Sequence, residues 1–201
     1  MNRTTIIQHL IDLYGYKRYL EIGVRKGVNF NAIKCDIKIG VDKDLKSAAT
    51  VFCTSDKFFE TNAEKFDLIF IDGSHEEKQV RKDIKNALHC LNSGGTIVIH
   101  DCNPSTEEMQ IVPRKQKEWT GDVWKAFVTY RALIGLTMKV VNCDYGVGII
   151  QEKDFDKEGE VLGFGEIQDL TYEKLDTNRK QWLNLISEAQ FYITYSSTYR
   201  I

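Results

Sequence analysis

The sequence predicts an α/β protein with an open, mostly parallel sheet and a reversed last strand, and two apolar runs carry this prediction. Phe66–Ile71 ends in Asp72, and Thr96–Ile99 ends in His100 and Asp101. One helix-length segment separates the two runs, which is typical of parallel strands joined by a crossover helix. The carboxyl ends of such strands meet at one edge of the sheet, where we expect the acidic side chains to lie beside a crevice.

The length, the charge and the cysteine usage of the chain limit the classes of protein to which it can belong. A chain of 201 residues suits one domain with an appendage, and its net charge of −2 comes without the basic block that binds a nucleic-acid backbone. No apolar run approaches the ~20 residues that cross a bilayer. The five cysteines are scattered without a Cys-x-x-Cys pair, as in reduced proteins. We therefore expect a cytoplasmic protein that binds neither nucleic acid nor membrane.

The first half of the chain alternates helical and extended patterns. Apolar residues at helical spacing predict a first helix, capped by Thr4 or Thr5 and ended by Gly15. A turn and a helix follow within residues 24–34, and Ser55 is expected to cap a later short helix. The predicted strands of this half are Arg18–Ile22, Ile37–Asp42, Ala49–Cys53 and Phe66–Ile71.

The second half begins with a predicted helix over Glu76–Leu91. The polar segment 104–118 is long enough for an active-site loop or a disordered lid, and Asp122–Ile134 has a helical pattern. A tight hairpin then makes the last strand antiparallel. Its parts are Lys139–Cys143, Asp144-Tyr-Gly146 and Val147–Gln151.

Residues 153–201 are expected to extend a domain formed by residues 1–152. The extension begins with the charged, glycine-containing stretch 153–160 and continues with an amphipathic helix over Thr171–Ile186. An aromatic tail, Phe191–Tyr199, can pair as an edge strand or dock on a second copy in a homo-oligomer.

Two features indicate a cofactor that contains a nucleoside. The segment from Glu21 to Gly27, with Gly23 inside it, follows the first strand and opens a helix, so its glycines allow a sharp turn close to a ligand. Its spacing differs from the G-x-G-x-x-G of dinucleotide enzymes, and a plain strand-to-helix turn is the alternative. Asp42 closes the second strand about 20 residues later, where a carboxylate can accept hydrogen bonds from ribose hydroxyls. The alternative for Asp42 is a helix cap or a solvated charge.

Four segments, taken in order, resemble the class I S-adenosylmethionine-dependent methyltransferases: Tyr19–Gly27, Ile39–Asp42, Phe66–His75 and Gly94–Asp101. The resemblance spans roughly residues 18–151. It includes the reversed hairpin that marks this fold among Rossmann-like, doubly wound sheets. Within the class, Ile71-Asp-Gly-Ser-His75 followed by His100-Asp101 resembles small-molecule O-methyltransferases of the macrocin and sugar type.

The resemblance implies S-adenosylmethionine as methyl donor and a hydroxyl of a small polar acceptor, such as a sugar, as its target. Asp42 would hold the ribose hydroxyls, and Asp72 would lie where cofactor, substrate and any metal meet. The implied cofactor-binding residues are Glu21, Gly23, Val24, Gly27, Asp42 and Asp72.

His75 is the candidate general base for removing the proton of such a hydroxyl. Imidazole accepts protons near neutral pH, and the carboxylate of Asp72, three residues away, can orient the ring. The alternative is a histidine that only caps the helix after it. His100 has a similar alternative as a satisfied core group.

Asp72 and Asp101 are candidates for catalytic positioning and for binding a divalent cation such as Mg²⁺. Related metal-dependent O-methyltransferases tend to supply a further Asp or Asn directly after the second carboxylate. This chain has Cys102 there, a poor ligand for a hard cation, followed by Asn103. Catalysis with and without a cation both stay open.

Trp119 and Trp124 flank a glycine turn and can present aromatic faces to a sugar ring, or Trp124 can belong to the core. Two rival functions are a nicotinamide-type (NAD) dehydrogenase, which shares the sheet and the ribose carboxylate, and a non-catalytic protein that binds the cofactor and assembles through its tail.

Overall fold

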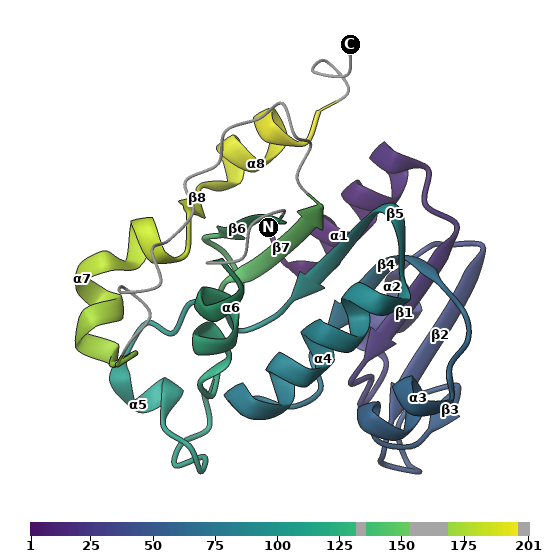
Figure 1. The fold of residues 1–201 in the computed structure, drawn as a ribbon, viewed down its shortest axis with the longest axis horizontal. Coiled ribbons are helices and arrows are strands. Elements are labelled where there is room, and N and C mark those ends of the chain that lie inside the picture. The colour runs from purple at the N-terminus through teal and green to yellow at the C-terminus, as the bar shows by residue number, and fades with distance from the viewer. Residues whose placement is uncertain (132–135, 153–168, 197–201) are drawn as a thin grey trace.

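The computed structural model describes residues 1–131, 136–152 and 169–196. These residues contain an eight-stranded sheet of order β3-β2-β1-β4-β5-β7-β6-β8 (Figure 1). The strands are β1 (Arg18–Ile22), β2 (Ile37–Asp42), β3 (Val51–Phe52), β4 (Phe66–Ile71), β5 (Leu91–Ile99), β6 (Leu136–Val141), β7 (Val147–Glu152) and β8 (Leu185–Ile186). Every paired neighbour is parallel except at β7, which runs antiparallel to β5 and β6. The predicted fold class and the predicted reversed strand are confirmed.

Helices cover both faces of the sheet (Figure 1). On one face the core contains α1 (Arg3–Tyr14), α2 (Val28–Ala32) and α8 (Glu188–Thr194). On the other it contains α3 (Ser55–Thr61), α4 (Glu77–Cys90), α6 (Val123–Arg131) and α7 (Tyr172–Trp182). A short α5 (Glu107–Gln110) lies in the segment after β5. None of the helices within the described ranges combines the length and the apolar character needed to cross a membrane.

Some local predictions were wrong by one or a few residues. The side chain of Asn2, in extended backbone, caps α1 by accepting from the Thr5 amide, so neither Thr4 nor Thr5 is the cap. Thr54, not Ser55, caps α3. The strand expected over Ala49–Cys53 is shorter, because only two residues of β3 pair with β2.

The segment 104–118 forms ordered structure and not a disordered lid. It contains α5, whose Met109 is buried, and the Met109 carbonyl accepts hydrogen bonds from the amides of Thr120 and Gly121. The predicted helix over Asp122–Ile134 begins at Val123 and is described as far as Arg131.

The C-terminal part of the chain joins the same core. The helix expected to reach Ile186 ends at Trp182, because Leu185 and Ile186 pair with β6 as strand β8. The first aromatic residues of the tail lie in α8, which Ser187 caps, and they do not form an edge strand. The predictions for residues 132–134, 153–160 and 197–199 lie outside the described residues. The division at residue 152 stays a prediction.

We expect Trp182→Ala to lower the free energy of unfolding by about 3–5 kcal/mol, because it leaves a cavity in a close-packed interior. The Trp182 ring is 5% exposed and stacks on that of Trp124 at 6.3 Å. Denaturant unfolding measures the loss, with Leu45→Ala as control, since Leu45 is 79% exposed. A loss at Trp182 no larger than that of the control would contradict the inclusion of α7 in the core.

Candidate active site

The sheet brings four predicted acidic residues to one edge. Glu21, Asp42, Asp72 and Asp101 lie at or directly after the carboxyl ends of β1, β2, β4 and β5, which are neighbours in the order β2-β1-β4-β5. The register pairs Ile71 of β4 with Ile99 of β5, so the chain leaves both strands at nearly the same level. The convergence expected from the sequence is therefore present in the backbone.

A tight turn after β1 forms part of this edge. Gly23 has a φ of +92°, and a Cβ atom there would lie 2.3 Å from the carbonyl oxygen of Asp72. The glycine is thus needed for contact between the β1 and β4 ends. The Asp42 carboxylate accepts hydrogen bonds from the amides of Val24 (3.1 Å) and Arg25 (2.8 Å), which ties the same turn to β2. Asp42 is neither a helix cap nor a solvated charge.

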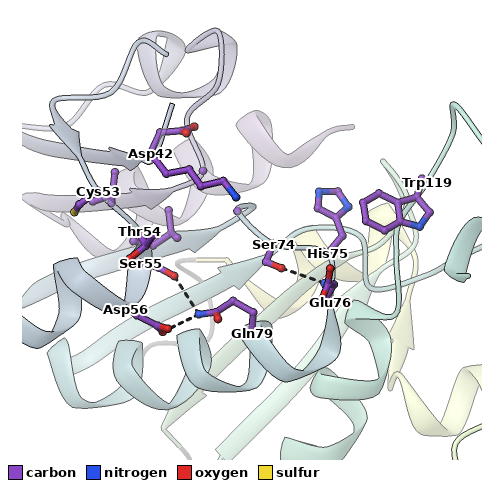
Figure 2. A pocket seen from close by; sticks show the side chains of 15 residues that line it. Asp42, Cys53, Thr54, Ser55, Asp56, Ser74, His75, Glu76, Gln79 and Trp119 are labelled. Carbon is purple, nitrogen blue, oxygen red and sulfur yellow. Dashed lines mark hydrogen bonds between the residues drawn. The ribbon is translucent and has the colours of Figure 1, made fainter. Parts of the chain in front are cut away.

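A pocket of about 490 Å³ opens beside the turn (Figure 2), which is within the range of small-molecule sites. It reaches from Asp42 to His75 and Trp119. Its lining also includes residues that the sequence reasoning missed, from the β3–α3 connection, the start of α3 and α4: Cys53, Thr54, Ser55, Asp56 and Gln79. They carry no motif signal, because their place on the wall follows from the position of β3 beside β2.

Glu21 does not line this pocket. Its carboxyl group is buried beneath α1 and α2, where it accepts hydrogen bonds from the Tyr19 hydroxyl (2.5 Å) and the Asn29 side chain (2.8 Å). Burial disfavours the charged form and raises the pKa of Glu21 to about 7, against the lowering effect of these two hydrogen bonds. Val24 and Gly27 likewise lie outside the lining.

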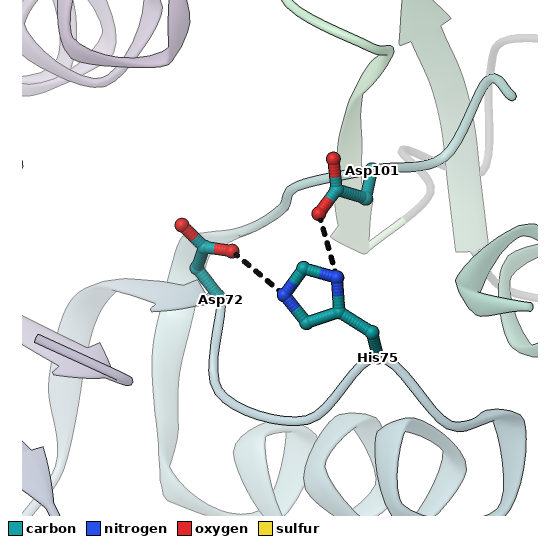
Figure 3. A group of neighbouring side chains, drawn as sticks. All are labelled: Asp72, His75 and Asp101. Carbon is teal, nitrogen blue, oxygen red and sulfur yellow. Dashed lines mark ion pairs between the residues drawn. The ribbon is translucent and has the colours of Figure 1, made fainter. Parts of the chain in front are cut away.

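The candidate base lies between two carboxylates (Figure 3). His75 Nδ1 is 3.0 Å from Asp101 Oδ2, and His75 Nε2 is 3.8 Å from Asp72 Oδ1. The angle at the shorter contact does not allow a hydrogen bond, so the buried Nδ1 has no hydrogen-bond partner. One ligand atom from each of the three residues falls within 4.8 Å of the others, a set of N and O donors that fits a divalent cation.

The structure excludes the view that His75 only caps α4. The Asp122 carboxylate accepts from the Glu77 amide (2.7 Å) and so caps this helix instead. The His75 carbonyl accepts from the Asp122 amide (3.1 Å), and the indole of Trp119 stacks on the imidazole at 5.0 Å and 6°. The His75 ring is therefore held in place from the backbone and from one face.

A second group of charges, which the sequence reasoning missed in part, lies behind Asp72. Arg3 of α1 donates its backbone amide to Asp144 (3.0 Å), and its guanidinium Nη1 is 3.3 Å from the same carboxylate. The guanidinium Nε is 3.9 Å from Asp72 Oδ2. Arg3 also contacts the ring of His100. No local pattern marks Arg3 or Asp144, because helix and hairpin bring them together from opposite ends of the domain.

His100 is buried but is more than a core group. Burial lowers the pKa of its ring, but the carboxylates of Asp101, Asp144 and Asp72 outweigh this effect and raise it to about 11. The Arg3 guanidinium opposes a second positive charge, yet one cation faces three carboxylates, so the raised direction holds. Asp144 responds in the opposite sense: burial raises its pKa, and hydrogen bonds from His100 and the Arg3 amide bring it down to about 2.

Two other predictions concern the residues after Asp101. The Cys102 thiol is buried in the core and is not directed at the three-residue cluster as a ligand. The Asn103 side-chain oxygen accepts from Arg179 (2.5 Å), so it is engaged elsewhere. Trp124 is fully buried and so belongs to the core, whereas Trp119 lines the pocket, where its aromatic face can meet a ligand.

Comparisons with known proteins agree with this arrangement. Residues 40–102 match the family model described as a methyltransferase domain. A candidate O-methyltransferase from Klebsiella pneumoniae is 18% identical, with a TM-score of 0.60 over 76% of this chain and 80% of that one. The O-methyltransferase from Bacillus cereus in complex with SAH is 16% identical, with a TM-score of 0.54 over 74% and 78%. A comparison with curated protein sequences gives no match.

A third solved structure, the O-methyltransferase TomG from Streptomyces achromogenes in complex with SAM, is 13% identical, with a TM-score of 0.55 over 74% of this chain and 79% of that one. This chain therefore shares its fold with solved O-methyltransferases, and its residues 40–102 match a methyltransferase domain. The resemblance inferred from the sequence is thereby confirmed.

The raised pKa of Glu21 predicts a pH-dependent stability. Because its folded pKa of about 7 lies above the ordinary 4.5, the carboxyl group stabilises the fold below pH 4.5 and loses this contribution as the pH rises through 7. Relative to Glu21→Gln, the wild type should lose about 2–3 kcal/mol of unfolding free energy across this window. Denaturant curves of both proteins at several pH values measure it. Parallel pH curves would contradict a neutral buried carboxyl group.

Proposed function

We propose that this protein transfers a methyl group from S-adenosylmethionine to a hydroxyl of a small polar acceptor, a sugar or a related metabolite. The observation that carries the proposal is the position of His75, which lines the pocket and lies within 4 Å of two carboxylates. Removing a hydroxyl proton requires a base within reach of that proton, held at a defined orientation. His75 is the only histidine in the lining of this pocket.

The pocket supports the cofactor assignment. Its wall combines the Gly23 turn, which has no side chain to obstruct a ligand, with Asp42 at the end of β2. Asp42 Oδ1, which accepts one hydrogen bond from the Asp44 amide, keeps room for a further one, from a ribose hydroxyl in this proposal. Glu21 does not line the pocket and would act indirectly, through its hydrogen bonds with Tyr19 and Asn29.

In the proposed mechanism the acceptor lies at the end of the pocket that His75 lines. His75 takes the hydroxyl proton as the oxygen attacks, while Asp72 and Asp101 hold the imidazole ring and the acceptor in line. The sulfonium of S-adenosylmethionine supplies the electrophilic methyl group. Trp119 covers one face of the imidazole and so limits the access of water to the base.

Asp72, Asp101 and His75 would also hold a divalent cation such as Mg²⁺, which supplies Lewis-acid activation of the hydroxyl when bound. With a cation present, the two carboxylates would serve mainly as its ligands. A cytoplasmic location and a homo-oligomer formed through the tail stay predictions.

Binding of S-adenosylhomocysteine tests the cofactor assignment directly. We expect titration calorimetry with the full chain to detect S-adenosylhomocysteine and to give no signal with NAD, because the dinucleotide glycine spacing is missing. Asp42→Asn should weaken S-adenosylhomocysteine by about tenfold. Binding of NAD instead would favour a dehydrogenase, and tight S-adenosylhomocysteine binding without turnover across a set of hydroxyl acceptors would favour a non-catalytic protein.

His75→Ala should lower turnover at pH 7 by about 10²-fold or more while S-adenosylhomocysteine affinity changes little, since the base acts on the acceptor. His89→Ala is the matched control, because His89 lies at the exposed far end of α4 and, within the described residues, its imidazole hydrogen-bonds only with the Lys85 carbonyl. Steady-state kinetics and calorimetry on the same variants separate the two effects. If affinity and turnover fall together, His75 supports the pocket and is not the base.

A further inference from the structure

We propose that Arg3 is a built-in counter-cation of the acidic centre, a positioning residue that shares Asp72 with any divalent cation and so weakens cation binding. The inference rests on the proposed function only for the location of the cation site. Its basis is the geometry of Arg3, which enters this centre from the first turn of α1 although it is distant from Asp72 in sequence.

Arg3 is held both at its backbone amide and at its guanidinium group. Its backbone amide donates to Asp144 Oδ2, which fixes the start of α1 on the β6–β7 hairpin. Its guanidinium then spans the gap from Asp144 to Asp72, with Nη1 at 3.3 Å from the first carboxylate and Nε at 3.9 Å from the second. The side chain is one-third exposed, so it is not sealed in the core.

Asp72 consequently contacts Arg3 through one oxygen and the rings of His75 and His100 through the other. Arg3 approaches Oδ2, while the cluster that fits a cation uses the oxygen facing His75, where Nε2 lies 3.8 Å from Oδ1. A divalent cation at that cluster would lie within a few ångströms of the guanidinium, and like charges at this distance repel in a partly buried site. Removing the guanidinium removes this repulsion and frees the Asp72 carboxylate to turn towards the cation.

The test is a Mn²⁺ titration of the full chain, followed by the electron paramagnetic resonance signal of free Mn²⁺. We expect Arg3→Ala to bind Mn²⁺ about tenfold more tightly than the wild type, and Arg3→Lys, which keeps the charge, to stay near the wild type. Adding Asp72→Asn to Arg3→Ala should abolish the gain. A purely structural role for Arg3 predicts weaker or unchanged binding, so a gain distinguishes the two roles.

Equal Mn²⁺ affinity in wild type and Arg3→Ala would overturn the proposal, as would a gain that survives Asp72→Asn or the lack of Mn²⁺ binding by every variant. Should Arg3→Ala fail to fold, Arg3→Gln preserves the length and polarity of the side chain and carries the same comparison. S-adenosylhomocysteine binding by these proteins reports separately on the proposed function, because the Asp42 end of the pocket lacks contact with Arg3.

Discussion

The pairing of β4 with β5 is the constraint on which the rest of this site depends. Its parallel register sets Ile71 opposite Ile99, so that Asp72 and Asp101 leave the sheet side by side and His75 can reach both. Parallel strands of one sheet direct their carboxyl ends to the same edge. The acidic side chains at these strand ends therefore lie close together. Their negative charges repel one another unless protonation or nearby positive charge offsets the repulsion.

This repulsion between carboxylates is reduced in two different ways along the edge. Glu21, on the side of α1 and α2, keeps its proton well above the usual pH range of a carboxyl group, because burial disfavours its charge more than its hydrogen bonds favour it and raises its pKa to about 7. Asp144 takes the other course and stays ionised, because Arg3 and His100 supply positive charge and donors. The N-terminal helix thus contributes to the centre both as a cover over Glu21 and as the carrier of a cation. This dual role explains why α1 belongs to the site and not only to the core.

The sequence predicted the parts of this arrangement that depend on local pattern. Strand β4 and the acidic end it carries follow from a short apolar run bounded by polar residues, whose length is typical of a buried strand. The N-cap of α1 is Asn2 and not Thr4 or Thr5 as predicted. The cap is the residue at which the backbone changes from extended to helical, and a run of adjacent polar residues does not show where this change occurs. Arg3 and Asp144 were missed as a pair, because their contact depends on the three-dimensional position of two elements 141 residues apart.

The charges also decide which histidine can act as the base. His100 faces three carboxylates, which raise its pKa to about 11 against the lowering effect of burial, and a ring that keeps its proton cannot accept another. Its position beside Arg3 and Asp144 also keeps it out of the lining of the pocket. His75, in contrast, lies on the pocket wall, and its Nδ1 is a buried atom without a hydrogen-bond partner among the described residues. These differences favour His75 over His100 as the base of the proposed mechanism.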